Sequence, residues 1–399
     1  IPVSMAIDTW AVDYVLLDEK DQILGDTYGY RDHRTDGMDA EVAKILPETE
    51  LYGKTGIQKQ IFNTVYQLMA VKQQTPELLQ QAKTLLMLPD YFGFRLTGNK
   101  LSEYTNGSTT QLVNPDTFQW DKELIRKLGY PEDIFLPLQM PGTKVGQLLP
   151  EIQKEVGFDL EVVLCGSHDT ASAVMAVPQT EGDGIYISSG TWSLMGIESL
   201  KPVITEDAAA ANFTNEGGYD HRFRFLKNIM GLWMIQSVRH EYNDAYSFAQ
   251  LCDMAEESKE FPSRVDVNDQ SFLSPDSMVE AIRQYCHKTG QPVPESVGEL
   301  TSVVYRSLAQ SYGETVRGLE KIAGKTYDSI HIIGGGSNAA YLNQLTADAT
   351  GKTVYAGPGE ATAIGNLLAQ MIHAGDLADL KSARKCVRES FEIKAFAPA

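Results

Sequence analysis

The stretch VLCGSHDTASA occupies residues 163–173 and is followed, after a short polar break, by GIYISSGTWS at residues 184–193. The first apolar run ends in Gly-Ser-His-Asp ahead of a helix of small residues. The second ends in Ser-Ser-Gly-Thr, where hydroxyl groups and a glycine suit a tight hairpin that faces a phosphate. The sequence therefore predicts a carboxylate, Asp169, at the end of one domain and a phosphate loop at the start of the next. This layout is typical of phosphoryl-transfer enzymes that work in a cleft between two lobes.

The length and charge of the chain set broad limits on what it can be. With 399 residues it is too long for one hydrophobic core and suits two domains with a cleft between them. Its formal net charge is -19, from 53 acidic and 34 basic residues, which disfavours non-specific binding to nucleic acid or to an anionic membrane. We therefore expect neither nucleic acid nor a membrane as a partner.

Cysteine and histidine usage argues against a structural metal and against a disulfide framework. The four cysteines are widely spaced without a Cys-x-x-Cys pair, and the seven histidines are scattered, so we expect no metal site built by the protein alone. The apolar runs are far shorter than a bilayer span, and no basic segment precedes them. These features predict a soluble protein of the reducing cytoplasm.

The distribution of apolar runs predicts an α/β fold. Residues 3–7 and 13–17 are expected to be two strands of a hairpin-like unit. Glycine and acidic residues interrupt two apolar runs at residues 181–184, and we place the domain boundary there. The predicted domains are residues 1–182 and residues 183–399.

In the second domain, residues 228–242 are predicted to form one helix. Asn228, Leu232 and Gln236 would then share a face, which mixes amides into an otherwise buried stripe. Buried amides need hydrogen-bonding partners, so this face is a candidate ligand contact.

Three glycines, Gly334 to Gly336, follow the apolar run at residues 329–333 and precede a predicted helix. Bare backbone there can approach a nucleotide while the helix N-terminus faces negative charge. Glycine-rich turns before helices are also common for packing reasons, so this motif alone is weak. The sequence contains neither Gly-x-Gly-x-x-Gly nor Gly-x-x-x-x-Gly-Lys-Ser/Thr, which disfavours Rossmann dinucleotide binding and the Walker NTPases.

Asp169 has two interpretations. It could simply cap a helix within a satisfied loop. However, the helix that it opens is made of small residues, which lets a substrate come close, and it lies near the predicted domain boundary, where a ligand cleft is expected. A carboxylate within reach of an alcohol can take its proton as it attacks a phosphoryl group.

Ordered motifs run almost from one end of the chain to the other. They are DTW at 8–10, YRDHRT at 30–35, FNT at 62–64, PDYF at 89–92, RLTG at 95–98, GSHDTAS at 166–172, SSGTWSLMG at 188–196, NEGG at 215–218, LKNIMGLW at 226–233 and IIGGG at 332–336. Together they resemble the FGGY family of carbohydrate kinases and, within it, the kinases of L-rhamnulose. The resemblance implies two ribonuclease-H-like, actin-like ATPase domains around a central cleft, the N-terminal one binding sugar and the C-terminal one binding ATP.

The resemblance also implies roles for individual residues around the sugar. Asp169 would be the general base that deprotonates the C1 hydroxyl of L-rhamnulose, with His168 as a sugar contact beside it. Trp10 and Ala11 would line the sugar pocket. Outside this resemblance, the charged turn at residues 30–35 is best interpreted as solvated.

On the nucleotide side, Thr191 would meet the ATP phosphates, Asn228 and Gln236 the nucleotide, and Gly335 the adenosine. The implied cofactors are ATP and Mg²⁺. Magnesium fits the composition because it needs only one or two carboxylates and takes its other ligands from water and nucleotide phosphates.

The sequence departs from the family pattern at three places. The printed residues lack the family's N-terminal Asp-x-Gly phosphate loop, the family's C-terminal helix is shorter, and Ala11 replaces a glycine at the sugar wall. We therefore expect the first domain to be incomplete and catalysis by these 399 residues to be impaired or absent.

The resulting hypothesis is ATP-dependent phosphorylation of L-rhamnulose to L-rhamnulose 1-phosphate in L-rhamnose catabolism. The partners would be the ketose and ATP, and the protein would be a monomer or a homodimer. One alternative is a kinase for a related deoxyketose such as L-fuculose. Another, from a different class, is a catalytically impaired actin-like nucleotide-binding protein.

Overall fold

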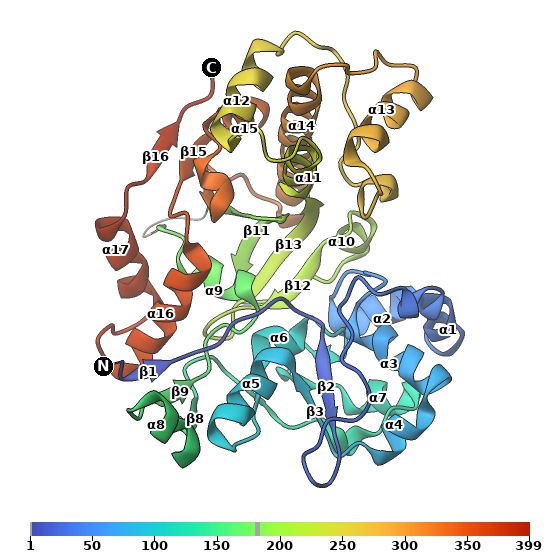
Figure 1. The fold of residues 1–399 in the computed structure, drawn as a ribbon, viewed down its shortest axis with the longest axis vertical. Coiled ribbons are helices and arrows are strands. Elements are labelled where there is room, and N and C mark those ends of the chain that lie inside the picture. The colour runs from blue at the N-terminus through green and yellow to red at the C-terminus, as the bar shows by residue number, and fades with distance from the viewer. Residues whose placement is uncertain (1, 180–183) are drawn as a thin grey trace. The chain divides into compact units, whose positions relative to one another are not determined.

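The computed structural model describes residues 2–179 and 184–399, and the chain divides into two compact units (Figure 1). Unit 1 comprises Ile1–Met175, Glu198–Phe225 and Thr362–Ala383, and unit 2 comprises Ala176–Ile197, Leu226–Ala361 and Arg384–Ala399. The domain boundary expected at residues 181–184 falls almost wholly outside the described residues. Strands and helices are mixed in both units, which makes the fold α/β.

Unit 1 contains short strands and many helices. Its strands are β1 (Ser4–Met5), β2 (Tyr14–Leu17), β3 (Thr84–Met87), β4 (Ser102–Glu103), β5 (Val113–Asn114), β6 (Gln119–Trp120), β7 (Leu138–Gln139), β8 (Lys144–Gln147), β9 (Glu161–Val163) and β12 (Thr214–Gly217). Its helices are α1 (Met38–Ile45), α2 (Glu48–Thr55), α3 (Thr64–Gln74), α4 (Pro76–Gln81), α5 (Leu88–Thr97), α6 (Tyr104–Ser108), α7 (Lys122–Leu128), α8 (Pro150–Val156), α9 (Asp169–Met175), α10 (Glu206–Ala210) and all but the first residue of α16 (Ala361–Ala374).

The hairpin expected near the N-terminus does not form. Strand β1 instead pairs in parallel with β9, which is antiparallel to β8, and β2 pairs antiparallel with β3. The reason lies between the two strands: Val12 adopts a left-handed backbone, with φ of 68°, and the backbone of Thr9 bonds to the chain around His168. The junction therefore forms a turn held against residues 167–169 rather than the loop of a hairpin.

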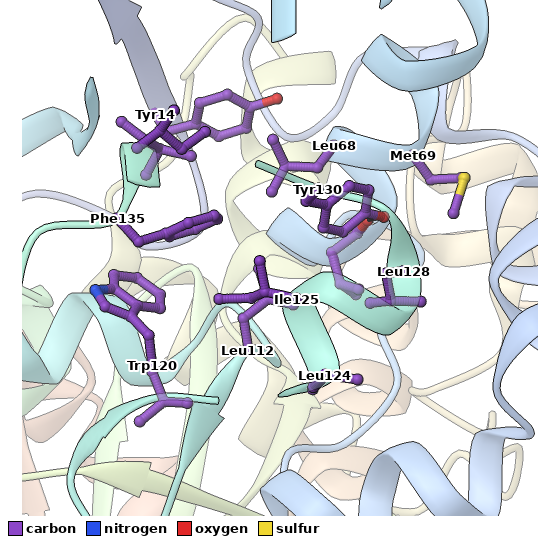
Figure 2. Close-up of a cluster of buried hydrophobic side chains, with 14 of the residues drawn as sticks. Tyr14, Leu68, Met69, Leu112, Trp120, Leu124, Ile125, Leu128, Tyr130 and Phe135 are labelled. Carbon is purple, nitrogen blue, oxygen red and sulfur yellow. Dashed lines mark hydrogen bonds between the residues drawn. The ribbon is translucent and has the colours of Figure 1, made fainter. Parts of the chain in front are cut away.

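The side chains of strand β2 alternate between two apolar clusters of unit 1. Tyr14 and Leu16 pack into a large apolar cluster, whereas Val15 and Leu17 face a second one with Leu86. Successive side chains of a strand point to opposite faces, so an uninterrupted apolar run serves both clusters. Figure 2 shows part of the large cluster, including Tyr14, Trp120, Ile125, Tyr130 and Phe135.

Unit 2 is built on a sheet whose neighbouring strands follow the order β13, β11, β10, β14, β15, β16. The strands are β10 (Ile185–Ser189), all but the last two residues of β11 (Trp192–Ser199), all but the first three residues of β13 (Phe223–Met230), β14 (Ser329–Ile333), β15 (Thr353–Ala356) and β16 (Lys394–Phe396). The helices are α11 (Trp233–Glu241), α12 (Phe248–Glu257), α13 (Met278–Lys288), α14 (Val297–Ala323), α15 (Ala340–Thr350) and most of α17 (Leu380–Ser390). Strands β10, β14 and β15 are mutually parallel, as βα units require.

The prediction of a single helix at residues 228–242 is wrong. Strand β13 runs to Met230, and α11 begins only at Trp233. The sequence FRFLKNIM buries residues on both faces of its strand, so sheet packing overrides the 3.6-residue periodicity. In the part of the chain that the structure describes, no helix is both long and apolar enough to cross a membrane.

A buried histidine in β14, His331, predicts a pH-dependent contribution to stability. Burial lowers the pKa of His331 to about 4, and the positive charges of Arg384 and Arg388 act in the same direction. The ring is 5% exposed and stacks on Tyr355 with centroids 5.4 Å apart. The unfolded state, with a pKa near 6.5, binds the proton more readily than the folded state.

We therefore expect the contribution of His331 to the free energy of unfolding to be constant above about pH 6.5 and to fall by about 3 kcal/mol towards pH 4. Urea unfolding at a series of pH values measures this slope. A His331→Gln variant should lose the His331 contribution, whereas the control His240→Gln, at a side chain that is 86% exposed, should retain it. An equal slope in wild type and His331→Gln would contradict the assignment.

Candidate active site

The Gly-Ser-His-Asp turn lies between β9 and α9 in unit 1. Gly166 must lack a side chain, because a Cβ there would lie 2.9 Å from the backbone nitrogen of Ser172. The turn is held by two backbone hydrogen bonds: Thr9 N donates to Ser167 O, and Asp169 N donates to Thr9 O, each at 2.9 Å. This places the N-terminal DTW motif directly beside the turn.

Asp169 is the first residue of α9, and its side chain is 45% exposed. Its Oδ1 accepts a hydrogen bond from Thr170 Oγ1 at 3.1 Å. The carboxylate is therefore open to solvent and not sealed in a packed interior. A group so placed can receive a proton from a bound alcohol.

In unit 1, His168 lies beside this carboxylate, and Trp10 follows Thr9, whose backbone bonds to the turn. His168 is buried, with its Nε2 atom 3.5 Å from Asp169 Oδ1. Trp10 is 50% exposed although it is a large aromatic residue, and its indole Nε1 donates to Asp13 Oδ2 at 2.7 Å. Ala11 follows Trp10 in the same bend and is half-buried. The structure thus places Asp169, His168 and the Trp10–Ala11 bend in unit 1, and the roles that the sequence suggested for them remain predictions.

Behind Trp10, a buried network joins the charged turn at residues 30–35. Asp13 accepts hydrogen bonds from Tyr30 N at 3.1 Å and Gln67 Nε2 at 3.0 Å, and Arg34 Nη2 donates to Gln67 Oε1 at 2.6 Å. Burial raises the pKa of Asp13. The neighbours of Arg34 at 31–33 are exposed, as expected for a solvated turn, but Arg34 itself is half-buried and supports the site.

In unit 2, Thr191 lies at the tip of the β10–β11 hairpin. The hairpin is tight, with Gly190 N donating to Trp192 O at 2.9 Å, and both Gly190 and Thr191 are exposed. The corner before α11 packs on it: Leu232 N donates to Gly190 O and Trp233 N to Thr191 O, each at 3.1 Å. The predicted hydroxyl-and-glycine hairpin is confirmed.

The triglycine segment lies against the same hairpin. A Cβ on Gly336 would lie only 2.0 Å from Ser189 Oγ, whereas one on Gly335 would meet nothing within 4 Å. Gly334 needs its left-handed backbone, with φ of 82°, and donates to Pro358 O at 3.0 Å. Packing therefore fixes the outer glycines, and Gly335 is left exposed for a close approach from outside.

The two amides assigned to the nucleotide lie on different elements. Asn228 is on β13, and Gln236 is on α11, where its N–H donates to Leu232 O at 2.8 Å. The shared helical face is therefore wrong, although both side chains are partly exposed. Instead of one helix, the chain forms strand β13 up to Met230, turns a corner at Gly231 and begins α11 at Trp233.

Comparison with known proteins decides the family. Residues 2–176 match the N-terminal domain of the FGGY family of carbohydrate kinases, and residues 185–374 match its C-terminal domain. The chain belongs to the FGGY family of carbohydrate kinases.

The similarity to other proteins of this family covers nearly all of the chain. It is 53% identical over 398 residues to a rhamnulokinase of Halalkalibacterium halodurans, covering 100% of this chain and 85% of that protein. It is 51% identical to a rhamnulokinase of Oceanobacillus iheyensis, covering 99% and 84%, and 46% identical to one of Bacillus subtilis, covering 99% and 81%.

Solved structures of the same fold include a ligand-bound xylulose kinase from Lactobacillus acidophilus, with a TM-score of 0.80, 17% identity, and coverage of 100% of this chain and 80% of that chain. A Plasmodium falciparum glycerol kinase with ADP has a TM-score of 0.75 and 15% identity, with coverage of 100% and 80%. At these identities the likeness concerns the fold.

A buried ion pair next to His168 was not expected from the sequence. Glu216 and Arg224, both buried, form an ion pair with 3.1 Å between Oε2 and Nη2. His168 Nδ1 lies 3.0 Å from Arg224 Nη2 and 3.3 Å from Glu216 Oε2. Burial opposes ionisation of Glu216, but the charge of Arg224 and the contact with His168 outweigh it, so the pKa of Glu216 is lowered. A hint in the sequence was Arg224, a charged residue within the largely apolar segment FRFLKNIM at residues 223–230.

FGGY kinases use ATP and Mg²⁺, and the acidic groups of unit 1 fit a hard cation. Asp8 accepts a hydrogen bond from Asn366 Nδ2 at 2.6 Å, and its pKa is raised by burial and also by the negative charge of Asp169. Added positive charge would relieve this repulsion. Within residues 2–179 and 184–399, no group of three or more His, Cys, Asp or Glu side chains is arranged to hold a metal ion.

Proposed function

We propose that this protein transfers the γ-phosphoryl group of ATP to the C1 hydroxyl of L-rhamnulose and forms L-rhamnulose 1-phosphate in L-rhamnose catabolism. The observation that carries the proposal is the exposed carboxylate of Asp169, held beside His168 and Trp10 in unit 1. Relatives named rhamnulokinase at 46–53% identity support the choice of sugar.

Asp169 acts as the general base. Its carboxylate accepts the proton of the C1 hydroxyl as that oxygen attacks the γ-phosphorus, and the bond to the β-phosphate oxygen breaks. His168 orients the sugar next to the base, and Trp10 and Ala11 form the wall of the sugar pocket. Phosphoryl transfer depends mainly on positioning and charge neutralisation, and these residues would supply the positioning of the sugar.

Unit 2 supplies the nucleotide contacts in this proposal. Thr191 and the exposed hairpin backbone meet the phosphates, Gly335 allows the adenosine to approach, and Asn228 and Gln236 hydrogen-bond to the nucleotide. Mg²⁺ would neutralise phosphate charge when bound, with Asp8 as a carboxylate near it and with water and phosphate oxygens as its other ligands. Residues 1–182 then form the sugar-binding domain and residues 183–399 the ATP-binding domain of a cytoplasmic monomer or homodimer.

A substrate panel tests the proposal. We expect kcat/KM for L-rhamnulose with ATP and Mg²⁺ to exceed that for L-fuculose by at least about 10²-fold, because a site built to pair one set of hydroxyls leaves polar groups unpaired with another. Coupled ADP release measures both rates. Preference for L-fuculose would change the substrate, and ATP binding without transfer to any ketose would favour an actin-like nucleotide-binding protein.

A further inference from the structure

A second carboxylate, Glu103, lies wholly buried behind the proposed base. It ends β4 and caps α6, and its relative exposure is 0%. Oε1 accepts from Thr105 N at 2.7 Å, and Oε2 accepts from Thr105 Oγ1 at 2.7 Å and Asn106 N at 2.9 Å. A cap of this kind is expected at the start of a helix. Its other contacts reach beyond that helix.

The same carboxylate binds the turn that carries the base. Ser167 Oγ donates to Glu103 Oε2 at 2.5 Å, and Ser167 N lies at 3.3 Å from the same oxygen. Thr105 Oγ1, itself held by Glu103, accepts from His168 N at 3.3 Å. Two of the three residues of the Ser-His-Asp turn are therefore tied to one buried carboxylate.

Asn106 and Thr9 complete the support of the turn. Asn106 Nδ2 lies 3.4 Å from both Ser167 O and Trp10 O, while Thr9 bonds to the backbone on either side of His168. The turn thus lies between the DTW segment on one side and the Glu103 cap on the other. A displacement of the cap would move Asp169 together with its neighbours.

The protonation state of Glu103 follows from its surroundings. A second buried carboxylate, Asp90, accepts from Glu103 N with both oxygens at 3.2 Å. Burial and the charge of Glu103 raise the pKa of Asp90 well above its usual value. Two neighbouring buried carboxylates cannot both ionise at low cost. Since Glu103 has five donor contacts, it is the one that carries the charge, although burial raises its own pKa as well.

We propose that Glu103 is a positioning residue for phosphoryl transfer, which orients the Asp169 carboxylate through Ser167 and Thr105. The inference rests on the proposed function, because it assumes that Asp169 is the base. A positioning group changes the geometry of the reacting atoms and leaves most ground-state binding intact. It should therefore act on kcat more than on KM.

The test compares Glu103→Gln and Ser167→Ala in the complete protein. We expect kcat to fall about 10²-fold in Glu103→Gln and about tenfold in Ser167→Ala, with KM for L-rhamnulose and ATP within about twofold of wild type. The matched control is Asp121→Asn, the same acid-to-amide change at the cap of α7, where Asp121 Oδ1 accepts from Leu124 N. That variant should keep its kcat.

The double variant separates positioning from general damage. Because both changes break one connection, Glu103→Gln with Ser167→Ala should lose no more activity than Glu103→Gln alone. The proposal would be overturned if the fold-losses in kcat of the two single variants multiply in the double variant. It would also be overturned if Ser167→Ala folds and keeps the wild-type kcat. Ser167→Ala therefore decides the question even if Glu103→Gln does not fold. Asp169→Asn in the same assay tests the base separately: if it stays active, the proposed function fails, whatever Ser167→Ala does.

Discussion

Asp169→Asn should lower kcat for L-rhamnulose by about 10³-fold, because the amide has the shape of the carboxylate but cannot accept the C1 proton. The side chain is 45% exposed, so the change should alter folding stability little. Steady-state kinetics with ATP and Mg²⁺ measure kcat, and circular dichroism checks the fold. The KM for ATP should change little.

The control for this experiment is Asp116→Asn, the same substitution at an exposed position of unit 1. It should leave kcat unchanged. An Asp169→Asn protein that keeps more than a tenth of the wild-type kcat would show that Asp169 does not take the proton. Another group would then have to be sought as the base.

Glu216→Ala should lower the free energy of unfolding by about 3–5 kcal/mol, because it leaves the fully buried Arg224 guanidinium without its carboxylate. Urea unfolding measures the loss. The exposed pair of Arg126 and Glu132 provides the contrast: Glu132→Ala should cost less than about 1 kcal/mol. Similar losses of unfolding free energy in the two variants would mean that the buried pair contributes no more to stability than the exposed one.

The same pair predicts how acid acts on unit 1. The folded pKa of Glu216 is lowered below the usual 4.5, so its contribution to stability is complete above about pH 4.5 and is lost as the pH falls through the folded pKa. Glu216→Ala should remove this part of the pH dependence. The difference in stability between wild type and variant should therefore shrink below pH 4.5.

The sequence was informative wherever function depends on local backbone geometry. The glycine of the Gly-Ser-His-Asp turn, the Ser-Gly-Thr hairpin and the triglycine segment each create a conformation or a close approach that a side chain would block. Such constraints are visible in a few consecutive residues. Asp169, the hairpin residue Thr191 and the exposed Gly335 all lie in such segments, and the short motifs around them were accordingly enough to select these three residues as candidates.

Only the tertiary structure decided which distant groups meet. Glu103 bonds to Ser167 across 64 residues, and Arg224 lies beside His168 across 56, so no local pattern links them. The helix expected at residues 228–242 and the N-terminal hairpin failed for the same reason, since sheet partners far along the chain outweighed local propensity. Local sequence thus determined the shapes of the turns, whereas burial within the folded chain determined the charged supports behind them.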